Sequence, residues 1–232
     1  YVDEAGIAHF GLKKLRTEEK EKAVREHFDR VAPRYDFMNT LLSFGIHYAW
    51  KRTAVRLLAP KPGDQVIDVC GGTGDLAVYC ARRIEPDGNV FLYDINRAMM
   101  QYGITRPENR RHKGGIHYIQ GDAETISFPD NTFDAATVGF GIRNLTHLKK
   151  GFTEMYRVLK PGGRIMCLEF SKPVNPVFRR LYDLYSFTAM PFFGAVLTGS
   201  SRSYTCLSET IRMFASPEEL ADIFEEIGFF EV

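Results

Sequence analysis

The sequence lacks several patterns that mark particular protein classes. Its four cysteines show no C-x-x-C spacing, and its six histidines form no H-E-x-x-H or other ligand spacing. We therefore expect no metal site, and reduced, buried thiols in a cytosol-like compartment. No internal repeat, low-complexity stretch or signal peptide is visible. Because the chain opens without a methionine and stops just after a helix, we expect both ends to be trimmed.

A large excess of charge of one sign is also missing. The 232 residues carry 30 Lys and Arg against 29 Asp and Glu, a formal net charge of +1. A dedicated nucleic-acid binder usually has a strongly basic surface, so we expect no nucleic-acid partner and interpret the basic cluster at residues 110–113 as a solvated loop. With 44% hydrophobic and 25% charged residues, the composition is typical of a soluble globular protein with one core.

What the sequence does contain is one glycine-rich stretch after an apolar, β-branched run. Residues 66–69 are apolar except for Asp68, and an apolar helical pattern begins at Leu76. Between them stand three glycines within four residues, Gly71, Gly72 and Gly74. A buried strand, a glycine turn and a helix N-terminus in this order predict a site for a nucleotide-like cofactor. Glycines there allow a sharp bend and let a ligand lie close to the backbone.

The glycine pattern by itself leaves the cofactor open. Residues 72–77 satisfy G-x-G-x-x-[GA], and Asp94 lies at the distance expected for a dinucleotide site. S-adenosylmethionine sites use the same strand–turn–helix architecture, so NAD(P) and S-adenosylmethionine both fit at this point. A turn that only packs a helix on a strand is the weaker alternative, since acidic residues also end two later strands.

Strand and helix patterns alternate through the middle of the chain. Apolar runs predict strands at residues 65–69, 89–94, 116–120, 133–140 and 164–170, and helical periodicity predicts helices at residues 17–31, 50–58, 76–84, 97–102 and 148–159. A turn at residues 161–163 separates the last of these helices from the fifth strand. A capping box at Ser216 opens one more helix, which Gly228 ends. This alternation predicts an α/β fold with a doubly wound, mostly parallel sheet.

We expect one domain in four parts: a helical cap at residues 17–60, a cofactor-binding core at 64–172, an insert at 173–214, and the last helix with the start of the final strands at 215–232. Residues 35–50 mix aromatic and polar side chains without a clean period, which suits a segment folded over a pocket or a cap on the sheet edge. Residues 184–201 carry no charge, but Pro191 and Gly194 break them too much for a spanning helix. They suit a buried insert or a lipid-facing wall.

The residues just after the predicted strands are the candidates for chemistry, because ligands bind beyond the carboxyl ends of such strands. The carboxylate of Asp94 can accept hydrogen bonds from two ribose hydroxyls. After the third strand, Asp122 can accept from an adenine amino group while the backbone N–H of Ala123 donates to a ring nitrogen. The other strand ends supply Asp68, residues 139–144 and residues 169–171.

Two long motifs resemble those of one known family. Tyr35-Asp36-x-Met38-Asn39, followed by Ser43, His47 and Trp50, is similar to one signature of the ubiquinone/menaquinone biosynthesis C-methyltransferases. The run from Arg157 to Gly163, with Glu169 and Ser171, resembles the other. Residues 121–124 and 140–144 also match, so the resemblance covers the chain from about residue 27 to residue 228.

The resemblance implies a seven-stranded S-adenosylmethionine-dependent methyltransferase fold with the last antiparallel strand absent from this chain. It implies that the cofactor binds at positions matching Thr73, Asp94, Asp122 and Ala123. The glycine turn, Asp68 and Gly139 complete the expected cofactor site. A serine often stands in the family where Gly139 stands here.

The implied reaction is methylation of a ring carbon on a reduced, polyprenylated benzoquinol, naphthoquinol or both. A neutral quinol carbon is a weak nucleophile, so a base, or a cation that lowers the phenol pKa, is needed. Our hypothesis is that Arg143, beside Asn144, stabilises the phenolate, because an arginine is effectively never deprotonated. A structural ion pair is the alternative role for Arg143. The resemblance also assigns a quinol pocket to Tyr35, Asp36, Asn39 and His47.

The isoprenoid tail of such a substrate must leave along an apolar path, for which residues 184–197 are the candidate wall. We therefore expect peripheral membrane contact, with a quinone-biosynthesis complex and a homodimer left open. A bacterial copy would work in the cytoplasm at the inner face of the membrane, and a eukaryotic copy in the mitochondrial matrix at the inner membrane. The competing functions are an NAD(P)-dependent oxidoreductase, a methyltransferase for another small molecule, and a non-catalytic scaffold.

Overall fold

The computed structural model describes residues 7–171, 173, 175–198 and 201–232. The chain divides into two compact units, one formed by Phe28–Glu169 and the other by Tyr1–His27 with Phe170–Val232. The first unit contains the parallel sheet and all the candidate cofactor and catalytic residues.

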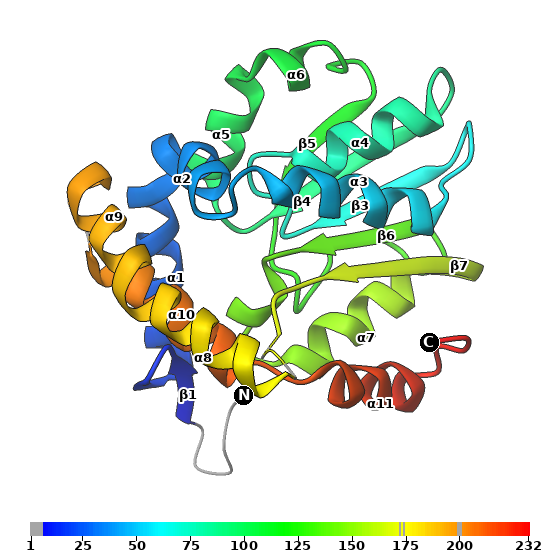
Figure 1. Ribbon diagram of the computed structural model, residues 1–232. Helices are drawn as coiled ribbons and strands as arrows, with labels where there is room; N and C mark the ends of the chain where they lie inside the picture. The colour runs from blue at the N-terminus through cyan, green and yellow to red at the C-terminus, as the bar shows by residue number, and fades with distance from the viewer. Residues whose placement is uncertain (1–6, 172, 174, 199–200) are drawn as a thin grey trace. The chain divides into compact units, whose positions relative to one another are not determined.

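The first unit is built on five parallel strands. They are β3 (Gln65–Val69), β4 (Asn89–Asp94), β5 (Ile116–Gln120), β6 (Phe133–Gly139) and β7 (Leu159–Leu168). Their order in the sheet is β5-β4-β3-β6-β7 (Figure 1). The chain thus moves outward in one direction from β3 to β5 and then in the other direction from β6 to β7. This confirms the predicted doubly wound α/β class.

The fifth strand begins earlier than predicted. Leu159 pairs with Phe133, and the next pair joins Arg164 to Ala135, so the register shifts between them. The predicted turn is present inside the strand, where Gly162 has a left-handed φ of +77°. The prediction of a strand starting at Arg164 was therefore wrong at its boundary, because the turn forms a bulge and does not separate helix from strand.

The sheet has five strands over the described residues, fewer than the seven of the fold implied by the resemblance. Residues 176–227 are mainly helical where they are described, and residues 228–232 form no strand. The expected start of the final strands at the end of the chain is therefore not formed.

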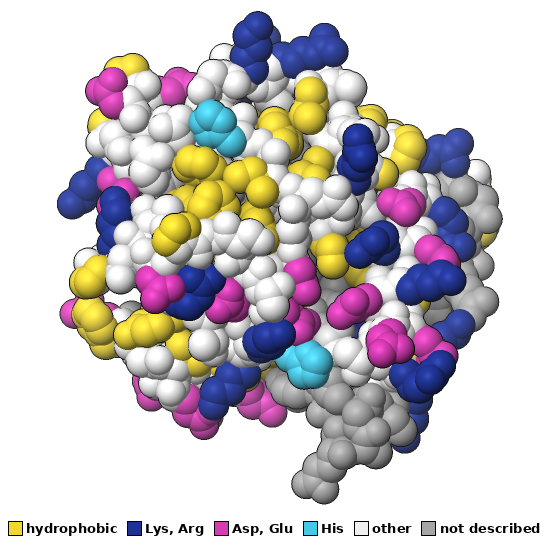
Figure 2. Space-filling view, turned by 180° about the vertical axis from the view of Figure 1, so that it is seen from behind, with side chains coloured by type: hydrophobic (Ala, Val, Ile, Leu, Met, Phe, Trp, Pro, Cys, Tyr) yellow, Lys and Arg dark blue, Asp and Glu magenta, His cyan; other side chains and the backbone are white. Residues whose placement is uncertain are grey.

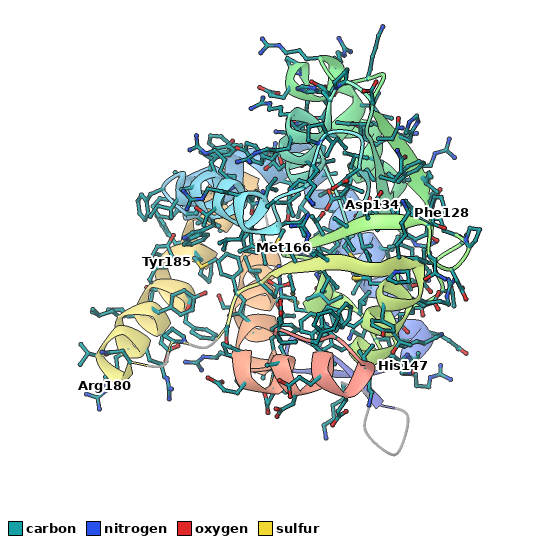
Figure 3. The ribbon with its side chains drawn as sticks, turned by 90° about the vertical axis from the view of Figure 1, so that its right-hand side faces the viewer. Phe128, Asp134, His147, Met166, Arg180 and Tyr185 are labelled. Atoms are coloured by element: carbon teal, nitrogen blue, oxygen red, sulfur yellow. The ribbon has the colours of Figure 1, made fainter. Side chains whose placement is uncertain are left out.

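Two helices pack on one face of the sheet. α3 (Ile46–Leu58) contributes Val55 and Leu58, and α4 (Asp75–Ile84) contributes Leu76, to one buried cluster with strand residues such as Val66 and Leu92. Strand residues one position away point to the other face. There Phe91 lies edge-to-face with Phe128 and Phe133, and Figure 3 labels Phe128 on the loop that precedes β6. Because both faces are covered, the strands read as continuous apolar runs.

The remaining helices of this unit connect the strands. They are α5 (Arg97–Thr105), α6 (Pro107–Arg110), the short helix η2 (Ile142–Asn144) and α7 (Leu148–Val158). The loop after α6 agrees with the expected solvated basic cluster, since Arg110, Arg111 and Lys113 are exposed. Figure 2 shows positive and negative side chains interspersed over one face of the molecule, in keeping with the small net charge.

The predicted cap is mainly helical. α1 (Thr17–Val31) has the predicted bounds, and it is followed by η1 (Ala32–Arg34) and α2 (Tyr35–Leu42). α3 starts at Ile46, four residues before the predicted start at Trp50. Gly45, at a left-handed φ of +74°, makes the turn between α2 and α3. The irregular pattern of residues 35–50 is therefore two short helices with a turn.

The second unit contains a hairpin and a group of helices. β1 (Ile7–Phe10) and β2 (Lys13–Arg16) pair antiparallel around Gly11, a hairpin that the sequence patterns did not reveal. The predicted insert forms α8 (Pro176–Leu184), the π-helical segment η3 (Tyr185–Ala189), α9 (Met190–Thr198) and α10 (Ser201–Met213). Residues 199–200 of the uncharged segment lie outside the described residues. In the part of the chain that is described, no helix is long and apolar enough to cross a membrane.

The last helix follows its predicted signals. α11 (Pro217–Ile227) starts at a capping box in which Ser216 accepts from the backbone of Glu219, and Gly228 ends it at a φ of +115°.

All four cysteines are free thiols, as expected, but only Cys80 is fully buried, while Cys70, Cys167 and Cys206 are half-buried. The expectation of buried thiols is therefore confirmed for Cys80 and met only in part by the other three.

Candidate functional site

The candidate site lies where the direction of the sheet reverses, between β3 and β6. The loops after these two strands are in contact, since a Cβ atom built on Gly141 would lie 2.4 Å from the Cβ of Cys70. Cys70 and Phe140 each follow a strand end with a left-handed φ, of 54° and 58°. Strained backbone of this kind persists where the surrounding structure fixes it, and it clusters at functional sites. The switch point is also where open α/β sheets bind ligands.

The glycine turn after β3 has a backbone that other residues would not adopt easily. Gly72 and Gly74 have φ values of +55° and +89°, and the N–H of Gly74 donates to the carbonyl of Gly71 at 2.9 Å. A Cβ at Gly71 would lie 2.6 Å from Leu92 Cγ. Only glycines therefore allow both this bend and the close packing against β4.

Asp94, at the end of β4, is tied to this turn. Its Oδ2 accepts from the N–H of Gly72 at 2.8 Å, and its Oδ1 accepts from the N–H of Asn96 at 2.7 Å. Burial raises the pKa of Asp94 to about 6, because these two hydrogen bonds only partly offset the loss of water. Each carboxylate oxygen has a second lone pair, so the group retains capacity for two hydroxyl donors.

Asp68, also predicted at the cofactor site, uses both oxygens for protein groups. Oδ1 accepts from the hydroxyl of Thr137 on β6 at 2.6 Å, and Oδ2 accepts from the N–H of Ala77 on α4 at 3.1 Å. Burial raises the pKa of Asp68 to about 7. Asp68 therefore joins β3, β6 and α4 beneath the turn, and its contact with a cofactor stays a prediction.

The loop after β5 is joined to the loop after β6. Asp122 Oδ1 accepts from the N–H of Glu124 at 2.8 Å, which closes a tight turn around the buried Ala123. Glu124 Oε1 accepts from the N–H groups of Thr146 and His147 at 2.7 and 2.8 Å. Burial tends to raise the pKa of Glu124, but these hydrogen bonds outweigh it and lower the pKa. The proposed adenine-binding turn is thus braced by Glu124, which the residue pattern alone did not single out.

Arg143 and Asn144 lie on η2, directly after β6. Nη1 of Arg143 donates to Glu169 Oε1 and to the carbonyl of Phe140, both at 2.6 Å. The structural ion pair considered above is therefore present. Among the described residues, however, Arg143 Nε and Asn144 Nδ2 are buried donors without a partner. Buried donors normally have an acceptor, so these two atoms point to a ligand or water site.

Gly139 ends β6 at a position with no room for a side chain. A Cβ there would lie 2.5 Å from Leu76 Cδ1. Close packing of α4 on the sheet thus explains glycine at this position, and Gly139 offers only its backbone to a cofactor.

The cap is tied to the glycine turn by buried charges. Asp36 Oδ1 accepts from the hydroxyl of Thr73 at 2.7 Å, and Arg106 lies 3.3 Å from Asp36 and 2.7 Å from Asp75. Lys51 lies 2.6 Å from the other oxygen of Asp75. Burial alone would raise the pKa of Asp75, but Lys51 and Arg106 outweigh it and lower the pKa to about 2. We call these residues, Asp36, Lys51, Asp75 and Arg106, the charge cluster.

The charge cluster shows what the segment of residues 35–50 covers. Asp36 reaches Thr73 in the glycine turn, so α2 lies against the predicted cofactor loop and not only against a sheet edge. Lys51, Asp75 and Arg106 were not among the predicted site residues. Lys51 had a signal, because it is the one charge on the buried face of α3 that also carries His47 and Val55. The other two look like ordinary surface charges in the sequence.

The other predicted pocket residues lie on α2 and α3. Tyr35 packs edge-to-face on Phe28, and the carbonyl of Asn39 accepts from the hydroxyl of Ser43 at 2.6 Å. His47 is buried, and its ring lies against that of Tyr48 with centroids 3.9 Å apart. The structure thus places Asp36 directly at the glycine turn, and Tyr35, Asn39 and His47 on α2 and α3, the two helices that contribute Asp36 and Lys51 to the charge cluster.

Known proteins share this fold. A methyltransferase from Thermotoga maritima has a TM-score of 0.60 and 23% identity, covering 89% of this chain and 81% of that one. A phosphoethanolamine N-methyltransferase from Haemonchus contortus has a TM-score of 0.61 and 20% identity, covering 89% and 44%. At such identities the likeness shows the fold alone.

Sequence comparison shows a closer relationship. The UbiE ubiquinone/menaquinone biosynthesis C-methyltransferase of Pseudomonas putida (strain GB-1) is 46% identical over 221 residues, which are 95% of this chain and 86% of that protein. The UbiE protein of Stutzerimonas stutzeri (strain A1501) is 43% identical over 227 residues, 98% and 89% of the two chains. A sequence profile described as the ubiE/COQ5 methyltransferase family matches residues 16–232. The chain therefore belongs to the ubiE/COQ5 methyltransferase family.

Proposed function

We propose that this chain transfers the methyl group of S-adenosylmethionine to a ring carbon of a polyprenylated benzoquinol or naphthoquinol. The names of its relatives support this substrate class. The observation that carries the proposal is the pair of buried, unpartnered donors, Arg143 Nε and Asn144 Nδ2, at the switch point of the sheet within the described residues. Membership of a methyltransferase family also removes the ground for the NAD(P) alternative.

The residues around the glycine turn fit an adenosyl cofactor. Asp94 retains lone pairs for two ribose hydroxyls, and the glycines leave the backbone open to close approach. The tight turn of Asp122 keeps the next N–H groups together at the end of β5, where a ring nitrogen can be bound. When bound, the cofactor supplies an electrophilic methyl group.

The chain's own residues must make the acceptor carbon reactive. Ionising a ring hydroxyl delivers electron density to the ring carbon, and a nearby cation favours the ionised form. Glu169 holds the guanidinium of Arg143 through Nη1, which leaves the Nε edge for an oxyanion. The amide of Asn144 supplies a second donor. Donors fixed in advance toward a developing charge are the usual form of such stabilisation.

Arg143 variants test this role. We expect Arg143→Ala to keep its affinity for S-adenosylhomocysteine and to lose roughly 10²- to 10³-fold in kcat, the effect of removing one oxyanion donor. Arg143→Lys keeps the charge but not the planar Nε–H, so it should recover only part of the rate. The matched control is Arg164→Ala, which removes an exposed arginine at the opposite end of the sheet. Unchanged turnover in Arg143→Ala would overturn the assignment.

Two measurements separate the remaining alternatives. S-adenosylhomocysteine should raise the melting temperature, and nicotinamide cofactors should not, because only a ligand of the folded state stabilises it. Labelled methyl incorporation into a short-tailed quinol then separates an enzyme from a non-catalytic scaffold. Incorporation into a different small molecule, and not into quinols, would agree with a methyltransferase but would overturn the proposed substrate class.

Exposed apolar side chains on α8 and α9 support peripheral contact with a membrane. Leu181, Leu184, Phe192 and Val196 on α8 and α9 are each more than 60% exposed, and Figure 3 labels Arg180 and Tyr185 on the same stretch of helix. Such a surface fits an acyl chain or the headgroup region of a membrane better than water. Liposome flotation of the double variant Leu184→Ser and Phe192→Ser tests this. Leu57→Ser, an equally exposed leucine on α3, is the control, and equal flotation of both variants would argue against a lipid-facing role.

A further inference from the structure

His47 is a buried histidine with one nitrogen left over. The residue is only 3% exposed. Its Nε2 lies 3.2 Å from the hydroxyl oxygen of Thr40, while Nδ1 has no partner among the described residues. A buried polar atom without a partner is uncommon and calls for an explanation.

The neighbours of Thr40 fix which nitrogen of His47 carries the proton. The Thr40 hydroxyl donates its single hydrogen to the carbonyl of Asp36 at 2.8 Å, and a carbonyl can only accept. Thr40 Oγ1 must therefore accept from its two other neighbours, the Tyr48 hydroxyl at 3.1 Å and His47 Nε2. His47 is thus the Nε2–H tautomer, and its unpartnered Nδ1 is a bare lone pair.

The position of His47 along α3 places it at the cofactor end of the sheet. Lys51, one turn later on the same helical face, reaches Asp75 at the start of α4 and lies 5.7 Å from the ring centroid of Phe140 at the end of β6. The opposite end of α3 lies near the start of the regular part of β7, where Arg164 donates to the carbonyl of Ala59 at 2.9 Å. His47 precedes Lys51 in α3, so it lies at the end of the helix that is nearer to the switch point between β3 and β6.

The surroundings keep this imidazole neutral. Burial first, and then the charge of Lys51, lower the pKa of His47 to about 4, with a smaller contribution in the same direction from Arg106 and an opposing one from Asp75. The lone pair on Nδ1 therefore persists throughout the neutral pH range. A group with so low a pKa is a weak base, but it remains a good hydrogen-bond acceptor.

We infer that His47 Nδ1 accepts a hydrogen bond from a ring hydroxyl of the substrate and so selects the reduced quinol over the oxidised quinone. The inference rests on the proposed function and deepens it. A quinol hydroxyl has a hydrogen to donate to the lone pair. A quinone carbonyl presents a second lone pair there, which repels the first and leaves both groups unpaired.

This selection complements the role of Arg143 and Asn144. Their unpartnered atoms are donors, whereas the unpartnered atom of His47 is an acceptor. A ring with two hydroxyls can satisfy both kinds of group, one oxygen accepting from the donors and the other hydroxyl donating to His47. An oxidised ring has acceptors only, so it can pair with the donors of Arg143 and Asn144 but offers no hydrogen to Nδ1 of His47.

The test is equilibrium binding of a short-tailed quinol and of the corresponding quinone, each in the presence of S-adenosylhomocysteine to prevent turnover. We expect the wild type to prefer the quinol. His47→Gln should lose roughly 5- to 150-fold in quinol affinity, the range for one unpaired buried group, with little change in quinone affinity. His47→Asn should retain more, because the amide oxygen of asparagine lies near the position of Nδ1.

The order of these two variants separates substrate recognition from a merely structural role. If His47 only holds α2 to α3 through Thr40, glutamine, whose amide nitrogen lies near the position of Nε2, should be the better substitute. Thr40→Val removes the group that fixes the tautomer and should reduce the preference for quinol, whereas Thr40→Ser should restore it. The exposed His117→Ala is the control, and Thr40→Val keeps the test informative if a His47 variant does not fold.

The outcomes separate the two proposals. If the wild type methylates the quinol, and His47→Gln has the same ratio of quinol affinity to quinone affinity as the wild type, the inference is overturned and the proposed function stands. A wild type that binds S-adenosylhomocysteine but neither binds nor methylates quinols overturns both. A ratio of quinol affinity to quinone affinity that falls toward one in His47→Gln and Thr40→Val supports the inference.

Discussion

The raised pKa of Asp94 leads us to expect that the affinity for the cofactor depends on pH. Its pKa in the free protein is raised to about 6 by burial. Only the ionised carboxylate can accept from two hydroxyls while it also accepts from the N–H groups of Gly72 and Asn96. Binding of an adenosyl ligand should therefore favour the ionised form, and affinity should fall as the pH drops below 6.

The size of the effect follows from the pKa. The fraction of Asp94 that is ionised falls about tenfold for each pH unit below the pKa, so affinity at pH 5 should be about tenfold weaker than at pH 8. The protein should remain folded at pH 5. Asp68 and Asp94 have raised pKa values, so the folded state gains stability as these two groups take up protons at falling pH. Asp75, with a pKa of about 2, loses its stabilising contribution only below its ordinary value near 4.

Calorimetric titration with S-adenosylhomocysteine between pH 8 and pH 5 measures this dependence. Asp94→Asn should bind roughly ten- to hundredfold more weakly at pH 8, because one charged acceptor is lost. It should also show a flat profile between pH 7 and pH 5, although Asp68 still titrates in this variant. A wild-type affinity that is constant from pH 8 to pH 5, or a variant that keeps the wild-type slope, would refute the reasoning.

Three further predictions concern the surroundings of the site. Arg106→Ala leaves Asp36 without its cation and leaves Asp75 with Lys51 alone, so it should lower the free energy of unfolding by about 3–5 kcal/mol, measured by urea denaturation. Gly141→Ala forces a Cβ to within 2.4 Å of Cys70 and should cost about 1–3 kcal/mol, with weaker S-adenosylhomocysteine binding by calorimetry. Glu169→Gln keeps an acceptor for Arg143 but removes the charge, so steady-state kinetics should give a smaller loss of kcat than Arg143→Ala.

The sheet could be predicted from the sequence because its signals are local. The bounds of β3, β4 and β5 match the apolar runs residue for residue. Parallel strands are buried on both faces, so each strand is a mainly apolar segment between polar turns, with Asp68 in β3 and His117 in β5 as exceptions. Once the strands are known, the topology rules bring the residues after them to one edge.

Boundaries that depend on distant partners were harder to predict. The early start of β7 is created by the pairing of Leu159 with Phe133, across a turn that looks locally like an end. The start of α3 at Ile46 depends on the left-handed Gly45. In both places a glycine permits more than one continuation of the chain, and packing elsewhere selects among them.

The charge cluster could not have been predicted from the sequence. Its members come from residues 36, 51, 75 and 106. The resemblance indicates Asp36 and the buried face of α3 indicates Lys51, but Asp75 and Arg106 each look like a solvated surface charge. Only tertiary packing makes their burial tolerable, because every charge has a partner of opposite sign within 3.3 Å. Local patterns therefore find backbone sites such as the glycine turn more readily than networks of side chains.

The electrostatics of the glycine turn also bear on the choice that its pattern left open. The charge cluster balances two cations against two carboxylates, so it adds little net charge to the site. Asp68 and Asp94, in contrast, are buried at the turn with raised pKa values, which means that hydrogen bonds compensate their anionic forms only in part. The negative charge of a dinucleotide pyrophosphate at this turn would raise both pKa values further, and repulsion from the ionised carboxylates would weaken its binding. A sulfonium cation near them would lower both pKa values, so the two buried carboxylates suit S-adenosylmethionine, although an acid at the position of Asp94 also fits a dinucleotide ribose.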